Sequence, residues 1–272
     1  MNTIAVLLSI YKNDNSLYLT ESIESILRQT YQDFLILIGV DGPVGKSLED
    51  VLVKYEKNDK IEVVKFNENR GLACVLNDLI ECAKAKNINY LARMDADDIA
   101  LPDRFEKQLI FLLQNESIDV VGGAITEIDG EGNLKNKTVK YPETPEQCRA
   151  FFSKRDPLAH PTAFFRFRYF DKVGHYYRPN YRKNQDTMLW FDGFKAGCLI
   201  ANISDVVLKF RTTDDFFKNR RNGLKRAVQY FKDRLTIIRE LGYGFDAKLF
   251  NVLIFIVTIS PAWIKKLAYK LR

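Results

Sequence analysis

The sequence has little of what builds metal–thiolate centres, disulfide frameworks or membrane spans. Its 272 residues include four cysteines and two histidines, and no two cysteines form a CxxC pair. This pattern supports neither a structural zinc site nor a set of disulfides, so we expect a reducing, cytoplasmic compartment. No segment approaches the roughly 20 consecutive apolar residues that a membrane-spanning helix needs.

The N-terminus also lacks the features of a secretory signal. The opening stretch "MNTIAVLLSIY" has no basic region ahead of its apolar run and no small-residue cleavage site. We therefore interpret it as a buried first strand. With 46% hydrophobic and 28% charged residues, the composition is typical of a globular protein with a full core. The length allows one large domain or one and a half.

The net charge of +6 is unevenly distributed along the chain. From Asp214 onward there are 13 Lys or Arg against 5 Asp or Glu, a balance of +8, which leaves the first 213 residues near −2. We therefore expect the tail to meet an anionic partner. No nucleic-acid recognition motif accompanies the basic residues, so we expect that nucleic acid is not this partner.

The first 125 residues alternate strand-like and helix-like patterns. Short apolar runs rich in β-branched residues, typical of parallel strands buried on both faces, lie at residues 3–10, 34–40, 61–66 and 89–94. Between them, apolar residues recur at helical spacing. We expect Thr20 to cap the first of these helices and Pro102 to open the last. The alternation predicts a doubly wound α/β domain with a mostly parallel sheet.

After about residue 125 this alternation loosens. We expect a turn at 129–133, a loop entering a helix at 141–147 and an extended aromatic segment at 160–170. From about residue 216 the chain is helical and basic. The predicted divisions are an α/β half (1–125), a second half of the same domain (126–213) and a C-terminal helical extension (214–272).

The stretch "LARMDADDIALPDR" (91–104) carries an apolar strand directly into Asp95, Asp97 and Asp98. Residues i and i+2 of an extended chain share a face, and α/β sheets bind ligands at the carboxyl ends of their strands. Asp95 and Asp97 therefore suit Mg²⁺ or Mn²⁺ shared with phosphates. An acidic strand-to-helix loop without a metal explains the same residues. We assign Asp98 and Asp103 to that structural role.

Several segments, in order along the chain, resemble the family 2 glycosyltransferases, bacterial inverting enzymes of GT-A fold. These segments are "SIYKND", "SIESILRQTYQDFLILIGVDGP", "NRGLACVLNDLI", "ARMDADDIALPDRFEKQ", "HPTAFFR" and "NQDTMLW". The resemblance covers about residues 3 to 211. The resemblance implies a Rossmann-like, mostly parallel sheet flanked by helices. It also implies that residues 1–125 bind a nucleotide sugar and that residues 126–213 face the acceptor.

The resemblance implies a set of donor-binding residues at the strand ends. Asp41 would accept a hydrogen bond from the uracil edge, although many relatives have Asp-Asp-Gly-Ser where this chain has Val40-Asp41-Gly42-Pro43. Ser9 and Tyr11 lie where the nucleotide binds, and a hydrophobic rim explains Tyr11 equally well. Arg70 begins a helix and would meet phosphate oxygens.

The acidic stretch gains a role from the same resemblance. Asp95 and Asp97 become ligands of Mn²⁺ or Mg²⁺, with Asp97 the more direct of the two. Arg93 either serves the diphosphate or holds Asp95 in a salt bridge, and the sequence leaves both interpretations open.

On the acceptor side the resemblance assigns the general base to Asp186. The family often has Glu-Asp where this chain has Gln185-Asp186, followed by an aromatic residue, here Trp190. An apolar wall from Trp190 would raise the pKa of the base toward a working value. Helix capping by Asp186 is the alternative. His160 resembles the family's acceptor-side His-Pro, and packing behind the site is its alternative.

Together these roles imply an inverting hexosyltransferase that uses a UDP-sugar in surface polysaccharide assembly, such as O-antigen or capsule. Asp186 would deprotonate an acceptor hydroxyl as it attacks the anomeric carbon, while the metal stabilises the departing diphosphate. Two alternatives are a sugar-phosphate nucleotidyltransferase and a non-catalytic membrane-surface binding protein. The former usually needs a glycine-rich loop near the first strand, and residues 9–16 contain no glycine.

The C-terminal segment "LFNVLIFIVTISPAWIKKLAYK" places Trp263, Lys265, Lys266 and Tyr269 after a short apolar stretch. Such a helix suits the headgroup region of an anionic membrane. A helix packed on the core with a solvated basic face is the alternative. We therefore expect a cytoplasmic enzyme held at the inner face of the membrane, acting on an undecaprenyl-diphosphate-linked glycan. The sequence does not determine whether galactose, N-acetylgalactosamine or glucose is transferred, nor the linkage or the oligomeric state.

Overall fold

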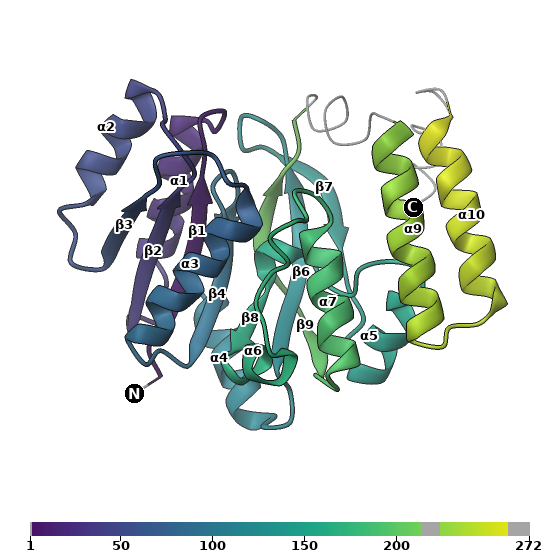
Figure 1. Cartoon of the computed structure of the whole chain (residues 1–272). Coiled ribbons are helices and arrows are strands. Elements are labelled where there is room, and N and C mark those ends of the chain that lie inside the picture. The colour runs from purple at the N-terminus through teal and green to yellow at the C-terminus, as the bar shows by residue number, and fades with distance from the viewer. Residues whose placement is uncertain (1, 214–223, 261–272) are drawn as a thin grey trace.

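The computed structural model describes residues 2–213 and 224–260, and these form one nine-stranded sheet covered by helices on both faces (Figure 1). The strands are β1 (Ile4–Ile10), β2 (Phe34–Val40), β3 (Ile61–Lys65), β4 (Tyr90–Asp95), β5 (Ile99–Ala100), β6 (Val120–Ile128), β7 (Leu134–Val139), β8 (Phe164–Arg166) and β9 (Ile200–Arg211). The helices are α1 (Ser16–Leu27), α2 (Lys46–Tyr55), α3 (Leu72–Ala85), α4 (Arg104–Gln114), α5 (Pro145–Phe152), α6 (Arg168–Val173), α7 (Gln185–Lys195), α9 (Leu224–Glu240) and α10 (Phe245–Ile259).

The first four strands form the parallel part of the sheet, in the order β3-β2-β1-β4. Their observed bounds agree with the predicted apolar runs to within a residue or two. Because the helices return the chain to the same end each time, the carboxyl ends of these strands lie at one edge. This edge carries the residues that end β1, β2 and β4.

Side chains of β1 alternate between two core layers, as the two-residue period of a strand requires. Ile4, Val6 and Leu8 pack with α1, α2 and α4 on one face. Ala5 and Leu7 pack with α3 and α7 on the other. Both faces are therefore buried, which explains why the sequence of this strand is apolar at almost every position.

The second half of the sheet is mixed in direction. β8 runs antiparallel to both β4 and β6, β9 runs parallel to β6, and the short β5 and β7 pair antiparallel with β9 and β6. The mostly parallel character predicted from the sequence thus belongs to the first half. Residue 125 lies inside β6, so both halves contribute to one continuous sheet.

Three local predictions were wrong: the start of α1, the start of α4 and the conformation of residues 160–170. Asn15, not Thr20, caps α1 by accepting from the amides of Leu17 and Tyr18, and the Thr20 hydroxyl bonds back to the carbonyl of Ser16 inside the helix. Pro102 precedes α4, which has Asp103 at its N-cap.

The segment 160–170 was expected to be extended throughout. It contains a 3₁₀ turn (His160–Thr162), the three-residue strand β8 and the start of α6. Helix α5 begins as predicted after 141–144, with Thr144 and Gln147 forming a capping box.

The C-terminal helices α9 and α10 form an antiparallel pair at the end of the molecule next to α5 (Figure 1). α9 packs on the core with Ala227, Ile237 and Ile238 buried. α10 packs on α9 and leaves one apolar stripe in solvent, made of Phe245, Leu249, Val252, Leu253, Ile256 and Ile259. Whether the segment from Leu249 onward binds membrane stays a prediction. Trp263, Lys265, Lys266 and Tyr269 lie outside the described residues.

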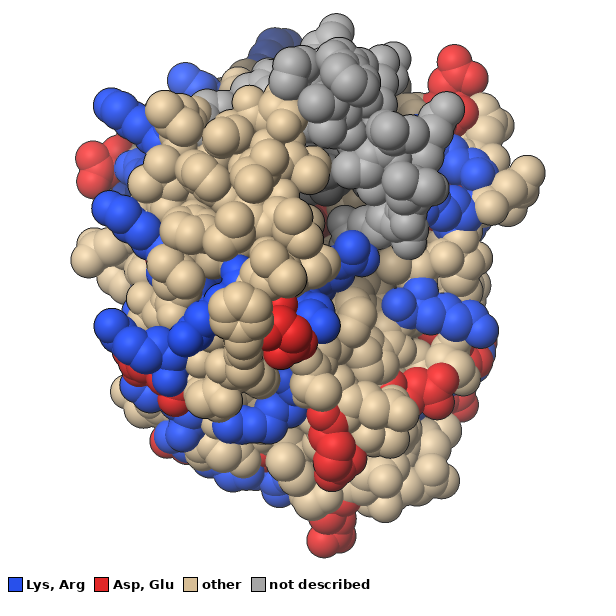
Figure 2. Space-filling view, turned by 90° about the vertical axis from the view of Figure 1, so that its right-hand side faces the viewer, with Lys and Arg blue, Asp and Glu red and all other residues tan. Residues whose placement is uncertain are grey.

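Figure 2 shows this face of the molecule, where a broad area without charge is bordered by Lys and Arg side chains. Exposed basic residues of the pair include Lys225, Lys232 and Arg239 on α9, which recur every seven residues, and Lys248 on α10. Within residues 2–213 and 224–260, no helix has the length and apolar character to cross a bilayer.

Candidate active site

The ends of the parallel strands bring the predicted donor-binding residues to one edge of the sheet. Ser9 lies beside Asp95 in the register of β1 and β4, and beside Gly39 in that of β1 and β2. Asp41 directly follows β2, and its amide donates to the carbonyl of Ile10 at the end of β1. Ser9, Asp41 and Asp95 are thus brought together by topology.

Asp41 is buried and ties the next strand-to-helix connection to its own. Its Oδ1 accepts from the amide of Arg70 at 2.7 Å, and its Oδ2 accepts from the amide of Gly71 at 2.9 Å and from Asn69 Nδ2 at 2.8 Å. Gly71 has φ of 92°, a conformation that favours glycine and turns its amide toward the carboxylate. Asp41 therefore shapes the rim of the site, and its contact with a nucleotide stays a prediction.

The remaining rim residues are Arg70 and Tyr11. The Arg70 guanidinium pairs with Asp78 on α3 and lies 4.3 Å from the ring centroid of Phe66. These two contacts hold the side chain, so it would have to leave Asp78 to bind a phosphate. Tyr11 is 41% exposed, and its amide donates to Asp14 Oδ2 at 2.8 Å. Their roles toward a nucleotide stay predictions.

The three aspartates that follow β4 form a cluster. Carboxylate oxygens of Asp95, Asp97 and Asp98 all lie within 4.8 Å of one another. Asp98, to which the sequence assigned a structural role, has a structural contact and also lies within the cluster. The turn after β4 folds the Asp98 side chain into the protein, where its Oδ1 accepts from the amide of Arg211 at 2.9 Å. Asp103 lies apart, at the start of α4, paired with Lys107.

The environment of Asp98 disfavours its ionised form. Burial, followed by the neighbouring charges of Asp97 and Asp95, raises its pKa well above the usual range of a carboxyl. No donor among the described residues bonds to its Oδ2, which is buried. A buried carboxylate oxygen in this position has the chemistry of a cation ligand.

Arg93 is buried inside β4 and pairs with Asp95 through Nη1. The salt-bridge interpretation is therefore confirmed. In the part of the chain that the structure describes, its Nε has no hydrogen-bond partner. This nitrogen is a buried donor close to the cluster, so the diphosphate interpretation stays a prediction beside the salt bridge.

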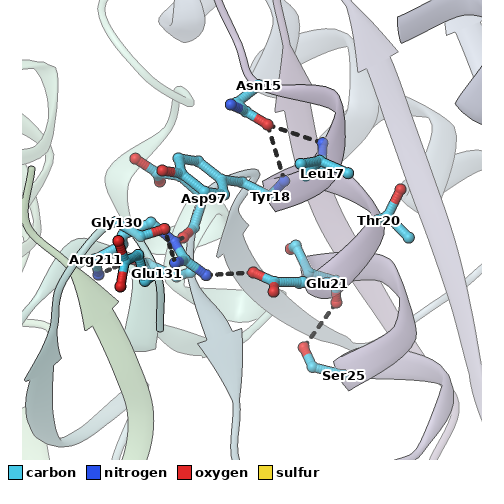
Figure 3. Close-up of polar contacts among 12 residues, drawn as sticks. Asn15, Leu17, Tyr18, Thr20, Glu21, Ser25, Asp97, Gly130, Glu131 and Arg211 are labelled. Carbon is cyan, nitrogen blue, oxygen red and sulfur yellow. Dashed lines mark hydrogen bonds and ion pairs between the residues drawn. The ribbon is translucent and has the colours of Figure 1, made fainter. Parts of the chain in front are cut away.

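Arg211, at the end of β9, bonds to the acidic loop (Figure 3). Only 3% of Arg211 is exposed. Its Nε donates to the carbonyl of Asp97 at 2.8 Å, Nη1 donates to the carbonyls of Asp129 and Gly130, and Nη2 pairs with Glu21. The guanidinium also lies 4.1 Å from the ring centroid of Tyr18.

Asp186 occupies the first turn of α7 and is electrostatically perturbed. Its pKa is raised to about 6 by burial and by the charge of Asp156, while the amide of Thr187 and the charge of Arg93 lower it. The Thr187 amide donates to Asp186 Oδ1 at 2.9 Å. Because Arg93 acts on Asp186 and also pairs with Asp95, the candidate base and the acidic cluster border one region.

His160 and Trp190 lie deeper than a substrate-contacting role suggests. His160 Nε2 lies 2.7 Å from the Tyr177 hydroxyl oxygen, and burial followed by the charge of Arg93 lowers the pKa of His160 well below its usual value. His160 is therefore neutral at physiological pH. Trp190 has no exposed surface and packs edge-on against His160 and flat on Phe165. Acceptor contacts by either residue stay predictions.

Sequence reasoning missed four charged residues near these groups. Asp14 has its pKa raised to about 7, chiefly by burial and also by Asp97 and Asp95, against the lowering effect of the Tyr11 amide. Arg211 lies more than 100 residues from the acidic loop, and Asp156 and Arg234 meet from segments 78 residues apart. Only Asp14, five residues after Ser9, carried a local signal.

Comparison with known proteins agrees with this geometry. The model of the family described as "Glycosyl transferase family 2" matches residues 6–174. The amylovoran biosynthesis glycosyltransferase AmsE of Erwinia amylovora is 31% identical over 236 residues, covering 86% of each chain. The UDP-Gal:alpha-D-GlcNAc-diphosphoundecaprenol beta-1,3-galactosyltransferase of Escherichia coli is 27% identical over 268 residues, covering 98% of this chain and 94% of the relative.

Solved structures show the same fold at lower identity. The S. aureus TarS 1-349 structure in complex with UDP-GlcNAc has a TM-score of 0.63 and 16% identity, covering 97% of this chain and 83% of that one. The chain spans only 42% of the longer TarS structure, with a TM-score of 0.62. The sheet order, the helices on both faces and the matched segments identify a GT-A fold. The chain therefore belongs to glycosyltransferase family 2.

Proposed function

We propose that the protein transfers a hexose or N-acetylhexosamine from a UDP-sugar to a hydroxyl of a lipid-linked glycan, with inversion at the anomeric carbon. The observation that carries this proposal is the cluster of Asp95, Asp97 and Asp98 at the carboxyl end of β4, whose carboxylate oxygens lie within 4.8 Å of one another. In this proposal the cluster and the buried Asp186 act on the same bound substrates. The printed names of the Escherichia coli galactosyltransferase and of the UDP-GlcNAc complex of TarS support the choice of donor and acceptor class.

The acidic cluster fits Mn²⁺ or Mg²⁺. Asp97, Asp95 and Asp98 offer oxygen ligands, the type that these ions prefer, and Asp98 Oδ2 is buried without a donor among the described residues. Three carboxylates this close repel one another unless a cation lies between them. A divalent ion bound there would neutralise the negative charge that develops on the departing nucleoside diphosphate.

Asp186 acts as the general base. It takes the proton of the acceptor hydroxyl while that oxygen attacks the anomeric carbon from the face opposite the diphosphate. A pKa of about 6 leaves the carboxylate ionised at neutral pH and makes it a stronger base than an ordinary aspartate. One base and one displacement give inversion, by the same logic as in inverting hydrolases.

Residues of the first half hold the donor. Ser9 and Tyr11 line the nucleotide beside Asp41, whose buried carboxylate fixes the rim and retains free lone pairs for the uracil imide. The unbonded Nε of Arg93 faces the diphosphate, and Arg70 at the start of α3 adds positive charge after exchanging its partner Asp78. His160 and Trp190 support the acceptor side from behind.

The α9–α10 pair places the enzyme on an anionic membrane surface, at the inner face of the cytoplasmic membrane. Its exposed apolar stripe, including Leu249, Leu253 and Ile256, is bordered by exposed basic side chains, which matches the two chemistries of a lipid headgroup region (Figure 2). An acceptor linked to undecaprenyl diphosphate lies in such a surface.

The direct test is a screen of UDP-galactose, UDP-N-acetylgalactosamine, UDP-glucose and UDP-N-acetylglucosamine for UDP release. Each donor is incubated with Mn²⁺ and a short-chain polyprenyl-diphosphate-linked sugar. We expect one donor to give acceptor-dependent release, with inverted anomeric configuration by NMR. Retained configuration, or release that never depends on the lipid-linked sugar, would contradict the proposal.

A further inference from the structure

Helix α9 contributes more than a surface for membrane binding. Two adjacent charged residues of this helix are linked by hydrogen bonds to the start of α7, Asp233 directly and Arg234 through Asp156. Asp233 and Arg234 are both buried. Burial of an arginine is tolerated only where its donors are bonded and its charge is paired. Arg234 meets both conditions. Arg234 Nε donates to the Tyr230 hydroxyl at 3.1 Å, Nη1 donates to the carbonyl of Phe152 at 2.8 Å, and Nη2 donates to Asp156 Oδ1 at 2.8 Å.

Asp156 connects Arg234 to the helix that carries the base. Its two carboxylate oxygens accept from the Thr187 hydroxyl at 3.1 and 2.9 Å. The amide of the same threonine donates to Asp186 Oδ1. A continuous chain of contacts therefore runs from α9 through Asp156 and Thr187 to Asp186.

Asp233 fixes the segment that leads into α7. Its carboxylate accepts from Gln229 Nε2 at 2.7 Å, and from the Tyr181 hydroxyl and Asn184 Nδ2 at 3.4 Å each. Asn184 immediately precedes α7 with φ of 59°, a conformation that needs support in a residue with a side chain. Adjacent residues of α9 are thus both linked to the N-terminus of α7, Asp233 through Asn184 and Arg234 through Asp156 and Thr187.

We propose that Arg234 and Asp156 are positioning residues for the reaction, with Arg234 fixing Asp156 and Asp156 setting the orientation and the charge environment of Asp186. This inference rests on the proposed role of Asp186 as the base. It assigns a role in chemistry to a helix that sequence reasoning treated only as a basic, membrane-facing extension.

The charges around Asp186 come from four elements. Asp156 faces it from the loop after α5, Arg93 from β4, Tyr177 from the loop before α7, and Arg234 from α9. Like charges raise the pKa of a carboxyl and opposite charges lower it. Asp156 therefore makes Asp186 more basic, and Arg234 limits that effect by compensating Asp156.

This arrangement makes opposite predictions for the two partners. In Asp156→Asn, the acid limb of the kcat–pH profile should move to lower pH by about half to one unit, because a like charge is gone. In Arg234→Met, the limb should move to higher pH by a similar amount, because Asp156 is left uncompensated. Arg234→Lys, which retains the charge, should restore most of the wild-type limb. A merely structural role would lower activity without shifting the acid limbs of Asp156→Asn and Arg234→Met in opposite directions.

A matched control is available on the same pair of helices. Lys195 at the end of α7 pairs with Glu240 at the end of α9 at 2.6 Å, far along the helix from Asp186. Glu240→Gln removes a more exposed ion pair between α7 and α9 and should leave the acid limb unchanged. Circular dichroism and UDP binding establish that each variant is folded. If Arg234→Met does not fold, Asp156→Asn still measures a shift to lower pH, and Arg234→Lys should stay near the wild-type limb.

The outcomes separate this inference from the proposed function. Asp186→Asn that is inactive but binds UDP-sugar, together with opposite shifts in Asp156→Asn and Arg234→Met, supports both. An inactive Asp186→Asn with unmoved limbs, or with limbs that move in the same direction, overturns the positioning role and leaves the base in place. An active Asp186→Asn overturns both.

Discussion

Two groups of carboxylates, each steadied by a buried arginine from a distant segment, lie at the site and differ in how their charge is compensated. In the loop after β4, the Arg211 guanidinium bonds to the carbonyls of Asp97, Asp129 and Gly130 and pairs with Glu21, so it fixes the loop mainly through the backbone. At the start of α7, Arg234 pairs directly with Asp156.

This difference explains how one residue type serves two chemistries. In the cluster after β4, three carboxylates meet one directly paired arginine, Arg93 on Asp95, and this excess of acidic groups suits a cation. Where the arginine pairs with one carboxylate of two, the other keeps a raised pKa and can accept a proton. Geometry, and not composition, separates a metal ligand from a base.

The largest expected effect comes from removing the base. Asp186→Asn keeps the size of the side chain and cannot accept a proton, so kcat should fall by about 10³-fold. UDP-sugar affinity, measured by calorimetry, should stay within about twofold of the wild type. Substantial remaining turnover would remove Asp186 from this role.

A substitution in the acidic loop should instead impair metal binding. Asp97→Asn should abolish measurable Mn²⁺ binding and lower activity by about 10²-fold, because a charged oxygen ligand is lost. Asp103→Asn, which alters only the exposed pair with Lys107, is the control and should behave as wild type. Equal Mn²⁺ affinity in both variants, by titration of the Mn²⁺ EPR signal, would contradict the assignment.

The comparison also sets a pH dependence. Because the pKa of Asp186 lies near 6 and the base must be ionised, kcat should rise with pH and level off above about 7. At pH 5 it should be about tenfold below the plateau, as one ionisation requires. In the folded protein this group binds its proton more tightly than in the unfolded chain, so its contribution to stability falls as pH rises from about 4 to 6. A profile flat between pH 5 and 7 would contradict the account.

Arg211 offers a smaller and more specific test. Arg211→Met should lower the free energy of unfolding by about 3 kcal/mol, since a buried charged network is broken. It should also weaken Mn²⁺ binding severalfold, because the Asp97 carbonyl loses the Nε donor that fixes the loop, while the backbone amide of residue 211 still donates to Asp98. Arg28→Met, which removes only an exposed pair with Glu24, should change neither quantity. Destabilisation with unchanged Mn²⁺ affinity would limit Arg211 to a structural role.

The smallest effect on chemistry is expected from the outer helix. Replacing Leu249, Leu253 and Ile256 together by serine should reduce flotation with vesicles of anionic phospholipid, because apolar contact with the headgroup region is lost. Activity on a water-soluble acceptor should stay near the wild-type value. If flotation is unchanged, this stripe does not face the membrane and serves another surface of the protein.

The sequence predicted the features that depend on neighbouring residues. The four parallel strands followed from their apolar runs, and the grouping of Asp95 with Asp97 followed from the period of a strand. Thr20 was a wrong choice of cap because Asn15, a residue of at least equal capping tendency, lies five residues earlier. Local signals did not distinguish the two.

Features that depend on distant residues were not predictable in the same way. Asp98 was given a structural role, but nothing near it in the chain shows that its partner is an amide of β9 or that its carboxylate joins the cluster. Asp156 and Arg234 form their pair only after α9 docks beside α5 and α7. The compensation of charge, which decides the chemistry of each carboxylate, is a property of tertiary contacts.

The central claim is that the loop after β4 binds a cation while Asp186 handles a proton. Calorimetric titration of UDP with and without Mn²⁺, on the wild type, Asp97→Asn and Asp186→Asn, tests it most directly. The account predicts Mn²⁺-dependent UDP binding in the wild type and in Asp186→Asn, and its loss in Asp97→Asn. Mn²⁺-dependent binding that survives in Asp97→Asn, or disappears in Asp186→Asn, would contradict the division between the two groups.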